Sequence, residues 1–188
     1  MRILLLLLIF PSLISAQKRK SSFSDTVLNV IPYKEGIVTY ERIYFLDTVE
    51  NKEKVFNAIK SALLKNTNYK QSKIDEDRIL GNITAYITFD FTAKPGISKL
   101  LFNAKTILSI DIKENRYRLR MYNNTYSTMV LGYLVNSTIE QQLENEKEQL
   151  RKGKWKPEKS TILNWHEVLT KILSEFPRMV NEGFSDEF

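Results

Sequence analysis

The sequence predicts an α+β fold, a curved antiparallel sheet of about five strands with helices packed on one face, in the order β-α-β-β-β-β-α. Apolar and polar residues alternate along three long segments between residues 79 and 121, as in strands that bury one face. The polar pair Glu114 and Asn115 joins two of these segments, which is typical of a hairpin turn. Apolar residues at helical spacing before and after the three segments predict helices that cover the buried face.

The elements that precede the three strands are a strand, a helix and a short strand. Residues 37–46 have the β-branched and aromatic composition of a strand. Asp47 and Glu50 have the spacing of a capping box, so we expect the helix to begin there. Residues 69–74 predict the short strand, and the acidic run 75–77 its turn. Calcium normally needs about six or more oxygen ligands, so this run is interpreted as a plain turn.

The chain that follows the three strands predicts two further helices. Residues 122–136 are expected to extend the last strand and then form a loop. Ser137 and Glu140 form a second capping-box pattern, which opens a helix with a thin apolar stripe that should be peripheral. Ser160 begins a last helix with a wide apolar face, and Pro177 is expected to kink or end it. We expect this last helix to cover the apolar face of the sheet.

The first 16 residues have the features of a signal peptide. Arg2 is basic, residues 3–14 are largely apolar, and Ala16 is a small residue at the end of the run. A membrane anchor needs about 20 apolar residues, and the basic run 18–20 ends this one earlier. We therefore expect cleavage after Ala16, export to the periplasm, the cell surface or the medium, and no transmembrane segment in the mature chain.

The rest of the chain predicts one domain. Residues 17–31 are interpreted as a flexible lead-in, and residues 32–184 as a single α+β domain with a core at 32–126 and a C-terminal helical part at 136–184. The sequence has no cysteine, so stability must come from packing without disulfide bonds. The net charge of +6 is modest, and the basic run 18–20 supplies much of it, which is typical of a solvated tail.

The sequence contains no motif that implies catalysis. Its single histidine, His166, borders an apolar helical face, and its few glycines form no phosphate-binding loop. Asp90 and Asp111 are both predicted on the outward face of the sheet, where paired carboxylates would suit a hydrolase. The basic residues around them favour cross-strand ion pairs instead. We therefore expect no enzyme, no cofactor and no metal site.

A basic row on the outward face is the candidate binding site. Arg116, Arg118 and Arg120 recur at the two-residue period of a strand, and Tyr86 and Lys105 are expected on the same side. Such a face suits an anionic partner. Interleaved acidic residues and the modest net charge argue against nucleic acid, which leaves an envelope protein, a glycan or a small ligand as the expected partner.

The stretch from about Pro32 to Tyr126 resembles a family of exported bacterial proteins of unknown function that have a TATA-binding-protein-like fold. The resemblance implies export and the fold, and it carries over no catalytic residue. It rests on patterns that occur in the same order along the chain: Gly36 to Tyr40, the helix with Val55, Phe56 and Ile59, Ile79 to Gly81 at the start of a strand, and Ile110 to Lys113 before Tyr117 and Arg118.

Together these features predict a non-enzymatic domain of the bacterial cell envelope that binds a partner through its sheet face or its helix-covered core. One alternative is a carrier of small hydrophobic ligands, which would need a cavity beneath the last helix. The other is a hydrolase that uses the sheet-face carboxylates.

We expect the exported protein to begin at Gln17. The apolar run before it is too short to remain as an anchor, and Ala16 offers the small residue that signal peptidase requires. The intact mass of the protein recovered from the exported fraction measures this directly. A mass that still includes residues 1–16 would contradict cleavage.

Overall fold

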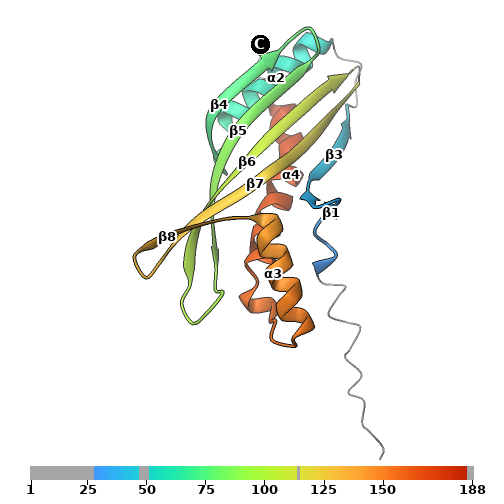
Figure 1. The fold of residues 1–188 in the computed structure, drawn as a ribbon. Helices are drawn as coiled ribbons and strands as arrows, with labels where there is room; N and C mark the ends of the chain where they lie inside the picture. Colours follow the sequence, from blue (N-terminus) through green and yellow to red (C-terminus); the bar gives the residue numbers. More distant parts are fainter. Residues whose placement is uncertain (1–27, 47–50, 114, 186–188) are drawn as a thin grey trace, which may run out of the picture.

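The computed structural model describes residues 28–46, 51–113 and 115–185, which form an α+β architecture (Figure 1). Within these residues the main sheet has six antiparallel strands in the order β3-β7-β6-β5-β4, with β8 also paired to β7. Because β6 occupies one edge of β7, β3 and β8 share its other edge. The strands are β3 (Tyr40–Phe45), β4 (Lys70–Asp77), β5 (Asn82–Ala93), β6 (Leu100–Lys113), β7 (Arg116–Val130) and β8 (Tyr133–Thr138).

The helices that cover the sheet lie behind it in the view of Figure 1. Helices α2 (Lys52–Lys65) and α4 (Thr161–Ser185) cover its apolar face, and α3 (Ile139–Arg151) packs beside the first part of α4. A short 3-10 turn, η1 (Pro157–Lys159), leads into α4, and a two-stranded ribbon, β1 (Tyr33–Lys34) with β2 (Ile37–Val38), precedes β3. The predicted fold class is confirmed, with β8 and its hairpin as an addition to the expected strands.

Alternation in β5 produces the two faces of the sheet. Ile83, Ala85 and Ile87 are at most 1% exposed, whereas Tyr86 between them is 38% exposed on the opposite face. The same alternation continues in β6 and β7, so three neighbouring strands bury one continuous apolar face. The predicted strands and their common buried face are confirmed.

Helix α4 fills that apolar face, as its wide apolar stripe predicts. Trp165, Leu169 and Phe176 are each 0% exposed. Near the end of α4, Gly183 lies so close to α2 that a Cβ atom would come within 2.8 Å of the carbonyl oxygen of Ala58. Glycine is therefore needed there for the two helices to meet. This packing explains why α4 continues through Pro177 to Ser185, since the contacts beyond the proline outweigh one lost backbone hydrogen bond.

Helix α3 is predicted to be peripheral, but it also fixes the start of α4 through a buried carboxylate. Glu146 is 3% exposed and accepts hydrogen bonds from the backbone N–H groups of Thr161 at 2.9 Å and Ile162 at 3.1 Å. The Ser160 hydroxyl also donates to Glu146 and accepts from the N–H of Leu163. A carboxylate at this position satisfies free N–H groups and faces the positive end of the helix dipole.

Two predicted helix starts are shifted in the structure. Asp47 and Glu50 lie outside the described residues, and α2 is capped by Asn51, whose side chain accepts from the N–H of Glu53. Helix α3 is capped by Thr138 in a capping box with Gln141, one residue later than predicted. The shift arises because the preceding residue, 137, still pairs with β7 as part of β8.

Three predicted loops or turns are also wrong. The acidic run 75–77 belongs to β4, where Asp75 and Asp77 pair opposite Thr84 and Asn82, and the turn falls at 78–81. Residues 122–136 contain the rest of β7 and most of β8 in place of a loop, because a second hairpin forms there. The expected lead-in ends early, since Leu28 and Ile31 are each only 3% exposed.

We expect Leu169→Ala to lower the free energy of unfolding by about 2 to 5 kcal/mol, because it leaves a cavity between α4 and the sheet. Leu64→Ala is the matched control, since Leu64 lies on α2 but is 56% exposed. This control should change the free energy of unfolding by less than about 1 kcal/mol. Urea titrations of both variants measure the difference, and equal losses would contradict the assignment of α4 as the core helix.

Candidate binding face

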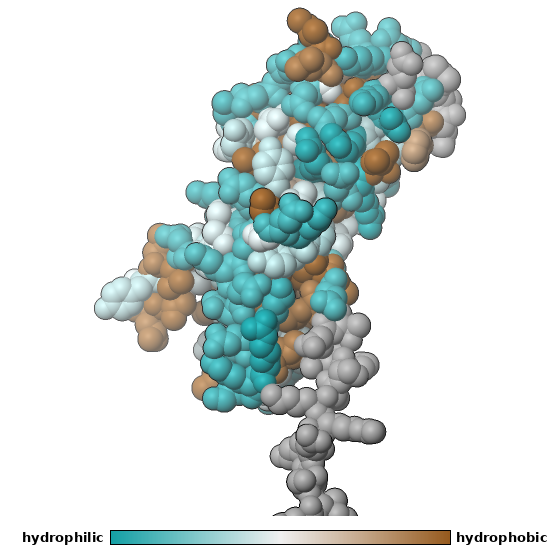
Figure 2. Space-filling model, turned by 45° about the vertical axis from the view of Figure 1, so that its right-hand side comes forward, coloured by the Kyte–Doolittle hydropathy of each residue, from teal (hydrophilic) through white to brown (hydrophobic). Residues whose placement is uncertain are grey.

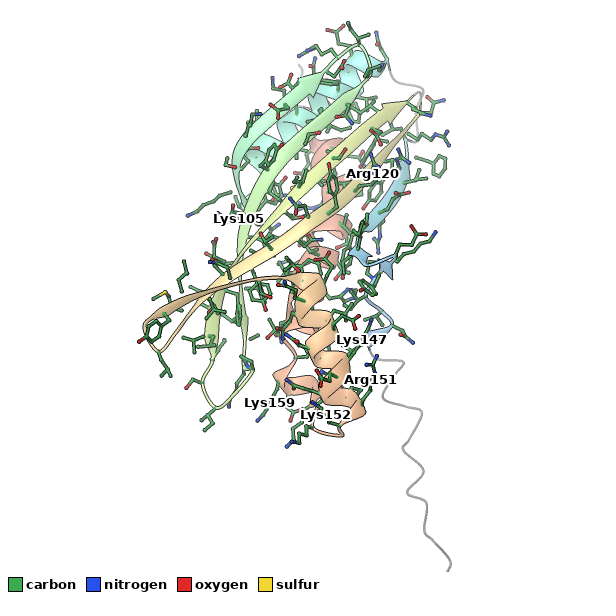
Figure 3. The ribbon with its side chains drawn as sticks, viewed as in Figure 1. Lys105, Arg120, Lys147, Arg151, Lys152 and Lys159 are labelled. Atoms are coloured by element: carbon green, nitrogen blue, oxygen red, sulfur yellow. The ribbon has the colours of Figure 1, made fainter. Side chains whose placement is uncertain are left out.

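In the described part of the chain, the side of the sheet opposite α2 and α4 is bordered by a helix only at the first turn of α3, and we call this side the open face (Figure 3). All five residues predicted for the binding site lie on strands of this sheet and point to this side, because each alternates with buried neighbours. They do not form one site, however. The arginines gather at one end of the open face, and Lys105 lies with Tyr86 farther along it.

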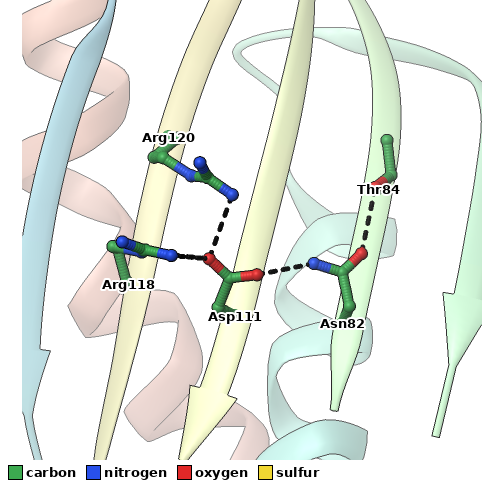
Figure 4. A network of polar contacts seen from close by, with 5 residues as sticks. All are labelled: Asn82, Thr84, Asp111, Arg118 and Arg120. Atoms are coloured by element: carbon green, nitrogen blue, oxygen red, sulfur yellow. Dashed lines mark hydrogen bonds and ion pairs between the residues drawn. The ribbon is translucent and has the colours of Figure 1, made fainter. Parts of the chain in front are cut away.

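Asp111 organises the arginine end of the open face (Figure 4). Arg118 donates to its Oδ2 atom from Nε at 3.0 Å and from Nη2 at 2.7 Å, and Arg120 donates to the same atom at 3.1 Å. Asn82 donates to Oδ1 at 2.7 Å, and its own side-chain oxygen accepts from Thr84. Strand register explains the cluster, because Asn82 and Arg118 stand directly opposite Asp111 on its two sides.

This network neutralises part of the predicted basic row. Burial alone would raise the pKa of Asp111, but hydrogen bonds from Arg118 and Asn82 and the charges of both arginines hold it below its ordinary value. The hydrogen bond to Asp111 likewise raises the pKa of Arg118. Arg116 makes no ion pair within the described residues, although it lines a hollow together with Lys113, Asp111 and Arg118. The predicted cross-strand ion pairs therefore form at Arg118 and Arg120, whereas Arg116 has none within the described residues.

The two carboxylates considered for a hydrolase are not neighbours. Asp111 stands opposite Asn82, whereas Asp90 stands opposite Asn103, which donates to it at 2.8 Å. Eight residues of β6 separate the two positions, a distance of about 25 Å along an extended strand. Paired-carboxylate chemistry is therefore excluded for Asp90 and Asp111. Glu114, which the sequence places in the turn before Arg116, lies outside the described residues.

A β-bulge shapes the middle of the open face. Between the pairs Lys105 with Thr125 and Ile107 with Tyr122, two residues of β7 oppose one residue of β6. Asn123 takes a positive φ of 53° there, and Asn124 is turned inward. The buried hydroxyl of Thr106 donates to Asn124 at 2.6 Å, and Asn124 donates to the Val38 carbonyl at 3.1 Å. The bulge bends β7 and ties β2 to the sheet.

Two hollows adjoin at this bulge and share Lys105 and Thr125. One has a volume of about 410 Å³ and extends toward β4, and the other has a volume of about 380 Å³ and extends toward β8. Lys105 forms no ion pair with any described residue, so its charge is available between the two hollows. Hydroxyl and amide side chains dominate the rest of the lining, which includes Ser72, Tyr86, Thr88, Asn103, Asn123, Ser127, Asn136, Thr138 and Gln141.

The remaining titratable candidate, His166, lies on the opposite side of the sheet. Its Nδ1 atom and the Tyr40 hydroxyl are joined by a hydrogen bond of 2.5 Å, and burial lowers the pKa of His166. It therefore joins α4 to β3 and plays a structural part. Within the described residues, no group of three or more potential ligand side chains could hold a metal ion, and no helix is long and apolar enough to cross a membrane.

Two solved structures are similar to this chain. A TBP-like protein from Parabacteroides distasonis matches with a TM-score of 0.60 and 17% identity, over 80% of this chain and 97% of that one. A DUF4468 family protein from Bacteroides ovatus matches with a TM-score of 0.52 and 10% identity, over 82% of this chain and 90% of that one. At such identities the likeness shows the fold alone, which is TBP-like as expected. No protein-family model matches the sequence, and no curated protein matches it.

We expect Asp111→Asn to lower the free energy of unfolding by about 1 kcal/mol, because it leaves two arginine charges side by side without their counter-charge. Arg118 and Arg120 are 43% and 35% exposed in their side chains, so solvent screening keeps the effect small. Added salt should reduce the loss further. Asp90→Asn is the control on the same face and should leave stability nearly unchanged. Denaturant titrations at low and high salt distinguish the two variants.

Proposed function

We propose that this protein is a non-enzymatic binding protein of the bacterial cell envelope that holds an acidic glycan along its open face. The observation that carries the proposal is the pair of adjoining hollows at the β6–β7 bulge, with the charge of Lys105 between them. Neither hollow is lined by a carboxylate. An anionic group that enters either hollow therefore meets the charge of Lys105, while the neighbouring carboxylate of Asp90 is bound by Asn103.

The lining chemistry favours a hydroxyl-rich ligand. Serine, threonine, asparagine and glutamine side chains both donate and accept hydrogen bonds, which suits the many hydroxyl groups of a sugar chain. Tyr86 is 38% exposed and offers a ring against which an apolar sugar face can pack. The two hollows share Lys105 and Thr125 and together reach from β4 to β8, so they suit an extended chain better than a compact molecule.

The other candidate functions find less support. A duplex laid across the whole open face would meet Asp75, Asp77 and Asp90 as well as the arginines that Asp111 already holds. A hydrophobic-ligand carrier would need space under α4, where Trp165 and Phe176 are fully buried against the sheet. A hydrolase would need the two carboxylates that the strand register keeps apart.

We expect Lys105→Gln to weaken binding of an oligogalacturonate about tenfold or more, because it removes a charge-assisted hydrogen bond to the uronate carboxylate. Isothermal titration calorimetry with oligogalacturonates measures the affinity, and neutral dextran oligosaccharides serve as the comparison ligand. Lys113→Gln is the matched control, since Lys113 is an exposed lysine of the same strand at the far end of the face.

Binding of the uronate should also weaken as salt rises. Tyr86→Ala should reduce the affinity for the same probe without changing the unfolding midpoint, because the side chain lies outside the core. Equal losses in the two lysine variants, or equal affinity for the neutral dextran, would show that the hollows at Lys105 do not select an acidic glycan.

A further inference from the structure

Two hairpin tips project from the same end of the sheet, and each exposes large apolar side chains. Strand register places the β5–β6 tip at residues 94–99 and the β7–β8 tip at residues 131–132 at this end. Figure 2 shows hydrophobic residues gathered on the projecting β7–β8 hairpin, at the left of the view. The exposed apolar side chains of this end are Ile97 (92%), Leu101 (62%), Met129 (55%), Leu131 (93%), Tyr133 (76%) and Leu134 (63%).

Packing of the fold does not explain why these positions carry large apolar side chains. Leu131 stands at a turn with a positive φ of 51°, a conformation that suits glycine or asparagine and is strained for leucine. Because its side chain is 93% exposed, no packing compensates for that strain. Ile97 is likewise exposed at the other tip and contributes nothing to the core. Exposed apolar groups that gather in this way mark an interaction surface.

The charged side chains of the two tips themselves are all basic. The sequence contains no aspartate or glutamate from Phe91 to Ile110 or from Arg116 to Thr138. Lys94 and Lys99 flank Ile97, and neither forms an ion pair with a described residue. The opposite end of the sheet also exposes apolar residues, yet Glu53 and Asp77 lie beside them. Of the two ends of the sheet in the described part of the chain, the hairpin tips are thus the end where basic residues accompany exposed apolar ones without an acidic neighbour in the turn.

We propose that the two hairpin tips dock on an anionic lipid surface. Ile97 and Leu131 enter the headgroup region, Tyr133 lies at the polar boundary, and Lys94 and Lys99 contact lipid phosphates. This combination of exposed apolar side chains, an aromatic side chain and lysines at the tips is what a peripheral membrane contact requires, whereas a protein partner would not need tips whose charges are all basic. The inference goes beyond the proposed glycan binding, because it rests on different residues and holds whether or not the hollows bind a sugar.

The test uses the chain from Gln17 onward, which keeps every described element and lacks the apolar leader. Vesicles of equimolar phosphatidylcholine and phosphatidylglycerol should sediment the protein, and vesicles of phosphatidylcholine alone should sediment far less of it. The double variant Ile97→Asp, Leu131→Asp should abolish sedimentation, and Lys94→Gln with Lys99→Gln should weaken it about tenfold. Ile79→Asp is the control, because Ile79 is 90% exposed at the opposite end of the sheet.

Sedimentation that is equal for the two lipid mixtures, or equal for the tip variant and the control, would overturn the proposal. Analytical ultracentrifugation of the same proteins detects the competing occupant, a second copy of the chain. A dimer that the tip variant disrupts, without binding to anionic vesicles, would show that the tips serve self-association. Circular dichroism confirms that each variant is folded, which is expected because the substituted residues lie outside the core.

Discussion

The structure depends on covering one apolar face of a long antiparallel sheet. Strands β5, β6 and β7 bury alternate residues on the same side, and α2 and α4 supply the apolar surface that keeps this side from water. The position of α4 is fixed at both of its ends, by Glu146 at its first turn and by the close contact of Gly183 with α2. Because all of this packing lies on one side, the other face of the sheet remains open and can be used for binding.

The β6–β7 bulge connects the core with the open face. On the buried side it turns Asn124 inward, where the amide satisfies Thr106 and the backbone of β2. On the outer side the same irregularity hollows the surface beside Lys105. The bulge also separates the two partners on the shared edge of β7. Pairing with β3 extends along β7 up to Met121, and pairing with β8 starts at Thr125. The sheet therefore has two halves that meet at the bulge. The candidate site therefore lies where the fold departs from regular strand geometry, which is where a flat sheet can form a concave surface.

The sequence predicts those features that depend on local patterns and misses those that depend on distant partners. Alternation identifies β5, β6 and β7 and places Arg118, Arg120, Tyr86 and Lys105 on the outer face, because a strand has a strict two-residue period. The pattern cannot show that Asp111 holds two arginines, since that depends on strand order and register. Glu146 appears in the sequence as one of several acids on a polar helix, and only the tertiary structure reveals the free N–H groups that it binds. The hollows at Lys105 were missed for the same reason, because the bulge has no clear sequence signal besides the adjacent asparagines 123 and 124.

The open face changes in character along its length, and this arrangement allows its parts to act independently. At one end Asp111 balances two arginines, in the middle uncharged polar groups surround Lys105, and at the other end lysines accompany apolar tips. These side chains contribute little to the core, so selection on binding can alter them at small cost to stability. The tips and the hollows also share strands β5 to β8, which are hydrogen-bonded neighbours in one sheet. A hairpin tip held against a surface would thus fix the orientation of the two hollows at Lys105. A ligand in these hollows would then lie at a defined distance from that surface.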